Sequence, residues 1–245
     1  MTALTDSRLE ATIERIESAN DIDELWLALR QFCESHGFES MTYFAANIPV
    51  LGISNDILLS TLPVDFIQHY IKQRYCEIDP VMLAAKSRLA PFDWAELDHS
   101  APNICRIRGE GRSAGIGRNA ISAPMRGANG DSALLSVSSD MDERDWGLLK
   151  RSYMRDVQLV ALSAHERFLA LAGATSVSRF APLSPRESEC LRWAATGKTI
   201  EDTAAILSLS ERVVRGYLDS ARQKLDCVTK TQTAVRALLL GLISL

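Results

Sequence analysis

Residues 183–243 read LSPRESECLRWAATGKTIEDTAAILSLSERVVRGYLDSARQKLDCVTKTQTAVRALLLGLI, and helix signals follow one another closely along this stretch. Ser184 and Glu187 form a capping box with a proline directly after the serine, so a helix is expected to begin here. Thr199 can cap a second helix in the same way, and Ser210 can cap a third. The stretch therefore predicts three short helices joined by tight turns.

The third of these helices has two chemically different faces. Its apolar side chains recur at 4-3-4 spacing and form one stripe to be buried: Val214, Leu218, Ala221 and Leu225. At about 100° per residue, the opposite face is mostly cationic: Arg212, Arg215, Asp219 and Arg222. Two short helices, a tight turn and a helix with an exposed cationic face are typical of a helix-turn-helix DNA-binding module. From these residues alone, a small bundle with merely solvated arginines is the alternative.

Polar side chains at the turns and on the cationic face are the candidate DNA contacts. Arginine can pair bidentately with guanine edges or bind phosphates. The candidates are Lys198, Thr199, Ser210, Arg212, Arg215 and Arg222.

The N-terminal part of the chain is predicted to be an α/β/α sandwich around a mostly antiparallel sheet, so the fold class is α+β followed by an all-α module. Its strand signals are bracketed by helix signals, which favours this layered arrangement. The expected strands are 40–47, 120–126 and 132–139, and the expected helices are 21–36, a short one after Pro63, and a long one from Asp140 or Asp142 to about residue 171.

Composition and charge divide the chain in the same way. The segment 173–182 is small, polar and nonperiodic, so we predict a linker between a domain at 1–172 and the module at 183–245. The module has nine Lys/Arg and seven Asp/Glu, whereas the rest has eighteen and twenty-four. The net charge of −4 therefore separates into about +2 and −6, as expected for a DNA-binding module joined to another domain.

Other classes of protein find little support. The five cysteines are scattered without a CxxC pair, and the four histidines (His36, His69, His99, His165) show no metal-binding spacing. The glycine-rich segment 109–115 lacks GxGxxG spacing, and no GxSxG elbow is present. No secretory signal or run of about 18 apolar residues is visible. We expect a cytoplasmic non-enzyme without catalytic residues, metal or membrane partner.

Residues 183–243 resemble the DNA-binding domain of the LuxR family almost residue for residue. Glu187, Leu191 and Gly197 stand where that family places its hallmark residues. The resemblance implies that a fourth helix at 231–240 completes a four-helix bundle and helps two modules to dimerise. The candidate side chains are Val235, Leu238 and Leu239, for which core packing is the alternative. Two residues depart from the family pattern: Val213 replaces a threonine that tends to contact the DNA backbone, and Gly216 lies within the recognition helix.

The N-terminal part resembles the acyl-homoserine-lactone-binding domain of quorum-sensing LuxR-type regulators. The resemblance is carried by LPVDFIQHYIKQRYCEIDPV (62–81), PFDW (91–94) and GIGRNAISAPMRGANGDSALLSVSSD (115–140). It implies that Asp79 accepts a hydrogen bond from the ligand amide, Tyr70 and Ser136 address the acyl side, and Trp94 packs on the lactone ring. Val81 is expected to line the same site. Read from the residues alone, the Asp79 carboxylate among apolar neighbours needs a donor, which a ligand amide or a neighbouring backbone N–H could supply.

Phe66 departs from this pattern. The family has a tryptophan there whose indole N–H donates to the lactone carbonyl, and phenylalanine cannot donate. An unpaired buried carbonyl costs about 1–3 kcal/mol, or ten- to hundredfold in affinity. Ala120 likewise stands where the family has glycine.

The sequence as a whole predicts a ligand-responsive transcriptional regulator. We expect it to bind an acyl-homoserine lactone or related signal and, as a homodimer, inverted-repeat promoter DNA, with RNA polymerase as a further partner. The alternative is a regulator that responds to another ligand or to none, with the N-terminal domain serving only to dimerise the chain.

Overall fold

The computed structural model describes the chain except residues 1, 47, 49–55, 128–129, 174–180 and 245, and excepting the side chains of 2–6 and 239. It contains two compact units, the first formed by Met1–Arg126 and Asp131–Thr175 and the second containing Ser176–Leu245. The predicted linker at 173–182 lies mostly outside the described residues. No helix among those described is long and apolar enough to cross a membrane.

A five-stranded antiparallel sheet forms the middle of the first unit. Its strand order is β2-β1-β5-β4-β3, and every pair of neighbouring strands is antiparallel. The predicted antiparallel sheet is therefore confirmed, and two short strands that the sequence analysis did not predict extend it at both edges. The strands are β1 (Ser40–Ala46), β2 (Ile57–Ser60), β3 (Phe92–Asp93), β4 (Asn119–Arg126) and β5 (Ser132–Ser139).

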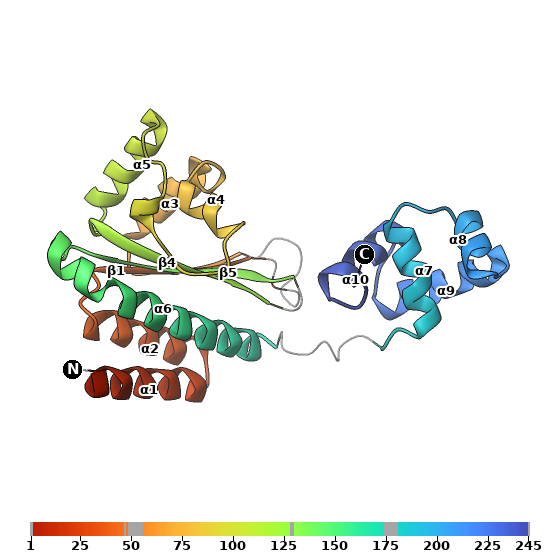
Figure 1. Ribbon diagram of the computed structural model, residues 1–245, viewed down its shortest axis with the longest axis horizontal. Coiled ribbons are helices and arrows are strands. Elements are labelled where there is room, and N and C mark those ends of the chain that lie inside the picture. The colour runs from red at the N-terminus through yellow and green to blue at the C-terminus, as the bar shows by residue number, and fades with distance from the viewer. Residues whose placement is uncertain (1, 47, 49–55, 128–129, 174–180, 245) are drawn as a thin grey trace. The chain divides into compact units, whose positions relative to one another are not determined.

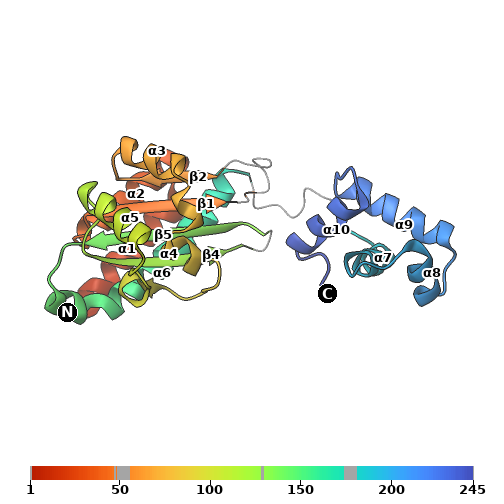
Figure 2. The same cartoon turned by 90° about the horizontal axis from the view of Figure 1, so that it is seen from above.

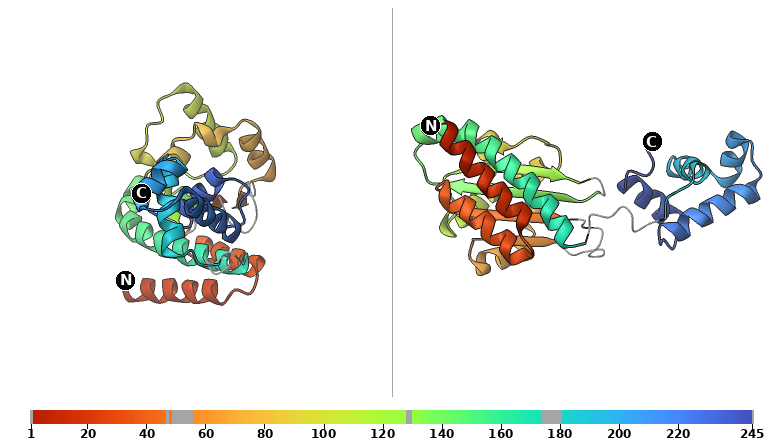
Figure 3. Two further views of the ribbon diagram at one scale, coloured as in Figure 1. Left: turned by 90° about the vertical axis from the view of Figure 1, so that its right-hand side faces the viewer. Right: turned by 90° about the horizontal axis from the view of Figure 1, so that it is seen from below.

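Helices cover both faces of this sheet, which confirms the predicted sandwich (Figure 1). On one face lie α2 (Ile22–Ser35) and α6 (Glu143–Leu171), and α1 (Thr2–Ser18) packs on the outside of both (Figure 3). On the other face lie α3 (Val64–Lys72), α4 (Pro80–Ala85) and α5 (Pro102–Ser113), which Figure 2 shows from above. Most of the glycine-rich segment 109–115 belongs to α5 and is therefore helical.

The two faces of the sheet differ in chemistry because side chains alternate along each strand. Met41, Tyr43, Leu135 and Val137 point to the α2–α6 side and are almost completely buried. The opposite face carries one hydroxyl from each of four neighbouring strands, in register: Ser60, Thr42, Ser136 and Ser122. In this hydroxyl row, Thr42 and Ser60 are 2.8 Å apart and Ser122 and Ser136 are 2.7 Å apart, oxygen to oxygen.

A buried chain of hydrogen bonds fastens α6 to the sheet. The Tyr43 hydroxyl donates to His165 Nδ1 at 2.8 Å, and His165 Nε2 donates to Asp131 Oδ2 at 2.8 Å. All three residues are at most 4% exposed. Burial, followed by the Asp131 charge, raises the pKa of the Tyr43 phenol, so it stays protonated and remains a donor.

The second unit contains the four predicted helices, and their predicted caps are confirmed. Ser184 and Thr199 each form a capping box and Ser210 caps the third helix. The stripe that begins at Val214 is buried, as predicted, with Ala221 and Leu225 fully so. The helices are α7 (Pro185–Ala195), α8 (Ile200–Leu207), α9 (Glu211–Lys224) and α10 (Lys230–Leu239).

One prediction concerns Gly117, which precedes β4. A Cβ atom there would lie 2.5–2.6 Å from the Ser139 backbone, whereas nothing lies within 4 Å of a Cβ at Gly109 in α5. We expect Gly117→Ala to destabilise the first unit by about 1–3 kcal/mol through overpacking. The control Gly109→Ala should stabilise α5 by up to about 1 kcal/mol. Equal melting temperatures of the two variants in thermal unfolding would contradict this account.

Candidate functional site

In the first unit, Tyr70 and Asp79 form one polar pair. The Tyr70 hydroxyl donates to Asp79 Oδ2 at 2.7 Å, and the Val81 backbone N–H donates to Asp79 Oδ1 at 2.9 Å. Asp79 is thus the N-cap of α4, which is the backbone role left open by the sequence. Burial raises the pKa of the Asp79 carboxyl, although these two hydrogen bonds and the His99 imidazole oppose that shift. The Val81 side chain is buried against Phe92 and Leu134.

Trp94 and Ser136 meet through a third residue. The Trp94 indole N–H donates to the Ser122 hydroxyl at 2.8 Å, and Ser122 lies 2.7 Å from the Ser136 hydroxyl. Trp94 thereby connects to the hydroxyl row of the sheet. Ser122 was not among the residues predicted from the sequence, although the alternation along the strand at 120–126 places it on the face opposite Ile121 and Ala123.

Phe66 lies beside this polar group without joining it. Its ring centroid is 6.3 Å from that of Tyr70, and a Cβ built at Gly111 would lie 3.8 Å from Phe66 Cζ. The ring therefore packs between α3 and α5. Ala120, the other departure near the predicted site, is buried on β4 and pairs with Ser138.

In the second unit, the cationic face of α9 is uneven. Arg212 and Arg215 are exposed and make no hydrogen bond or ion pair with any described residue. Arg222 is half-buried, donates to the Cys227 carbonyl at 3.3 Å and pairs with Asp219 at 3.6 Å. The two N-terminal arginines are therefore the freer ones on this face.

The polar candidates at the turns hold the helices in place. The Thr199 hydroxyl accepts from the Asp202 N–H at 3.0 Å, and the Ser210 hydroxyl accepts from the Val213 N–H at 3.4 Å. Lys198 is exposed beside them. A groove of about 330 Å³ lies beside the cationic face of α9. It is lined by Ile200, Arg215, Leu218, Asp219, Arg222, Val228 and Lys230.

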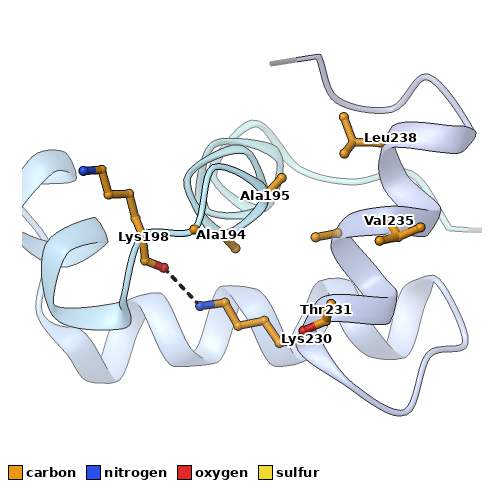
Figure 4. A pocket seen from close by; sticks show the side chains of 9 residues that line it. Ala194, Ala195, Lys198, Lys230, Thr231, Val235 and Leu238 are labelled. Carbon is orange, nitrogen blue, oxygen red and sulfur yellow. Dashed lines mark hydrogen bonds between the residues drawn. The ribbon is translucent and has the colours of Figure 1, made fainter.

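A second groove, of about 250 Å³, lies between the end of α7 and α10 (Figure 4). Val235 and Leu238 line it, and Val235 is 51% exposed. The Lys230 ammonium closes one side by donating to the Lys198 carbonyl at 3.4 Å. Val235 is thus more accessible than core packing would require, and the side chain of Leu239 lies outside the described part.

Glu187 is the buried ionic centre of the second unit. It accepts hydrogen bonds from the Ser184 N–H at 2.6 Å, the Ser220 hydroxyl at 2.7 Å and the Lys224 ammonium at 2.8 Å. Burial alone would raise its pKa, but these donors, led by Lys224, outweigh it and lower the pKa to about 2. One carboxylate therefore joins the start of α7 to α9.

Family comparisons agree with both units. Residues 21–168 match the autoinducer binding domain family, and residues 181–237 match the luxR family of bacterial regulatory proteins. The chain therefore belongs to the LuxR-type transcriptional regulators, in which an autoinducer-binding domain is joined to a DNA-binding helix-turn-helix domain.

Individual proteins show the same likeness. The chain is 31% identical to the transcriptional activator RaiR of Rhizobium etli over 73% of its own length and 74% of RaiR. It is 29% identical to the quorum sensing-dependent regulator RpaR of Rhodopseudomonas palustris over 96% and 93%. The fold matches crystalline Escherichia coli SdiA with a TM-score of 0.71 at 20% identity, covering 98% of this chain and 99% of SdiA.

The Glu187 network predicts a pH-dependent loss of stability. Because the pKa is depressed in the folded state, its stabilising contribution is complete above the ordinary carboxyl pKa of about 4.5 and disappears as the pH falls towards 2. We expect Glu187→Gln to cost the second unit about 3 kcal/mol at pH 7, as measured by calorimetry of the full chain. Glu189→Gln removes the exposed pair with Arg186 and should cost under about 1 kcal/mol. A Glu187→Gln deficit that persists at pH 2 would refute this assignment.

Proposed function

We propose that this protein senses an acyl-homoserine lactone or a closely related signal with a domain at 1–172 and binds promoter DNA with the module at 183–245. The observation that carries the proposal is the half-buried Asp79 carboxylate, which accepts from Tyr70 and lies in the part of the chain that matches the autoinducer-binding family. A half-buried carboxylate with capacity for another donor fits an amide N–H.

The proposed contacts follow the family pattern at the matching positions. Asp79 accepts from the amide of the signal, Tyr70 and Ser136 lie along the acyl group, and Trp94 packs on the head-group ring. Val81 contributes an apolar wall beside Asp79. Filling this layer with an apolar chain would add buried area between the sheet and α3–α5, and so stabilise the first unit.

Dimerisation is proposed to place two α9 helices in successive major grooves, about 34 Å apart on an inverted repeat. The exposure of Val235 supports α10 as one contact between two copies. Arg212 and Arg215 are proposed to reach bases or phosphates, accompanied by Lys198, Thr199, Ser210 and Arg222. Relatives named as transcriptional activators support activation as the outcome of DNA binding. RNA polymerase as a further partner and the cytoplasm as the place of action are part of the same proposal.

A second candidate is a regulator that binds a ligand other than a lactone, or none. Phe66 favours it, since this side chain cannot donate to a lactone carbonyl. A protein of similar fold has been solved with a ligand that is not a lactone, namely SdiA in complex with octanoyl-rac-glycerol.

The first prediction of this proposal concerns ligand-induced stability. A signal present at 100 times its dissociation constant should stabilise the folded chain by about 2.7 kcal/mol. We expect a rise in melting temperature with at least one member of a panel of acyl-homoserine lactones of different chain lengths, and no rise for Asp79→Asn. The absence of a shift across the panel would exclude the lactone but leave the DNA-binding role intact.

The second prediction concerns DNA. Arg212→Ala and Arg215→Ala should each weaken specific binding by about 1–3 kcal/mol if the side chain reads a base. The exposed Arg192 on α7 lies outside the cationic face, so Arg192→Ala serves as the control. Binding is measured by titration at several salt concentrations, where a phosphate contact lowers the salt dependence. An undiminished affinity of the double variant would rule out α9 as the recognition helix.

A further inference from the structure

His99 has a buried ring nitrogen without a partner beside the proposed ligand-binding residues. Its Nε2 lies 2.7 Å from the Trp94 carbonyl oxygen, and its Nδ1 is buried and makes no hydrogen bond with any residue that the structure describes. Buried polar atoms are almost always paired, so such an atom calls for an explanation.

The hydrogen bond to Trp94 determines what Nδ1 can do. A carbonyl oxygen only accepts, so Nε2 must carry a hydrogen. In the neutral ring, Nδ1 is then a hydrogen-bond acceptor. The Cys105 thiol donates to the His99 carbonyl at 3.2 Å and helps to hold this residue in place. In the neutral ring, Nδ1 is therefore a fixed, buried acceptor.

His99 belongs to the same site as Asp79 and Trp94. Its imidazole is close enough to the Asp79 carboxylate to act on its pKa, and its Nε2 bonds to the backbone of Trp94. Asp79 accepts one hydrogen bond on each oxygen, and each oxygen can accept another. The Asp79 carboxylate and His99 Nδ1 can thus each accept a further hydrogen bond.

Tyr70 and Trp94, the two donors nearest Asp79 and His99, are already engaged. The Tyr70 hydroxyl donates to Asp79 at 2.7 Å, and the Trp94 indole N–H donates to Ser122 at 2.8 Å. Phe66, which packs beside Tyr70, has no donor at all. At Asp79 and His99 a ligand would find acceptors for its own N–H and O–H groups, whereas neither the Tyr70 hydroxyl nor the Trp94 indole N–H is free to donate to a carbonyl.

We propose that His99 Nδ1 is a specificity-determining acceptor and that the head group of the ligand presents a hydrogen-bond donor to it, in addition to the amide N–H that Asp79 accepts. The expected head-group class is a hydroxyl- or amine-bearing one in place of a ring whose only polar groups are ester oxygens. This inference rests on the proposed function, since it assumes that the Asp79 site binds a signal.

A matched pair of synthetic ligands tests the proposal. N-(2-hydroxycyclopentyl)octanamide and N-(2-oxocyclopentyl)octanamide share the acyl chain, the amide and the ring, and differ in one hydroxyl against one carbonyl. Isothermal titration of the full chain gives both dissociation constants, with N-octanoyl-homoserine lactone as a third ligand. We expect the alcohol to bind ten- to hundredfold tighter than the ketone, because the ketone leaves its carbonyl and His99 Nδ1 both unpaired.

Variants assign the preference to particular residues. His99→Phe should abolish it, and His99→Gln, whose amide can both donate and accept, should retain part of it. Phe66→Trp adds a donor and should shift the preference towards the ketone and the lactone. His69→Gln is the control, because His69 pairs with Glu110 away from Asp79. Each preference is the ratio of two dissociation constants measured on the same variant. A fraction of unfolded protein changes both constants by the same factor, so it cancels from the ratio.

The outcomes separate this inference from the proposed function. A ketone or lactone that binds as tightly as the alcohol would overturn the donor-bearing head group, while leaving the signal-binding role in place. An alcohol preference that survives in His99→Phe would overturn the role of His99. If none of the three ligands binds, and no acyl-homoserine lactone raises the melting temperature, the proposed function itself fails and the inference falls with it.

Discussion

The first unit depends on a sheet whose two faces have opposite chemistry. On β1 and β5, alternate side chains are apolar and pack against α2 and α6, whereas several of the intervening ones carry hydroxyls, among them Thr42 and Ser136. Because the side-chain period of a strand is two, a shift of one residue in register would bury the hydroxyls and expose the core. The same alternation that fixes the register therefore also places a polar surface under α3, α4 and α5, where the proposed ligand-binding residues lie.

The second unit relies on a single charge instead of an extended surface. The Glu187 carboxylate accepts from the backbone of one helix end and from two side chains of α9. A buried carboxylate is tolerated only when donors surround it, so the three partners must be held together. Removing any of them would affect the angle at which the cationic face of α9 is presented, even though none lies on that face.

Local signals in the sequence were enough to predict much of the fold. Some signals act over a few residues and can be recognised without tertiary context. They include caps such as Ser184 and Thr199 and the alternation along β4 and β5. The edge strands β2 and β3 are too short for a periodic signal, and α5 contains Gly109 and Gly111, which weaken a helix prediction. These elements are determined by what they pack against.

The candidate sites show the same division between local and distant information. Asp79 and Tyr70 are nine residues apart and could be proposed together on the family resemblance. Ser122 bonds to Trp94 across 28 residues, and Lys224 bonds to Glu187 across 37. No periodicity links such residues, so their pairing follows only from the arrangement of the elements. His99 likewise gains its meaning from the Trp94 carbonyl that orients its ring.

The pairing of Tyr70 with Asp79 and of Trp94 with Ser122 has a consequence for recognition. A molecule that enters this layer must exchange hydrogen bonds with groups that already have partners, and such an exchange is close to neutral in free energy when every bond is replaced. Affinity would then come mainly from the apolar area that the ligand buries. The polar groups would determine which ligand binds, because leaving one of them without a hydrogen-bond partner costs more free energy than a replaced hydrogen bond gains. Strength of binding and choice of ligand would thus be separable properties, open to independent change by mutation.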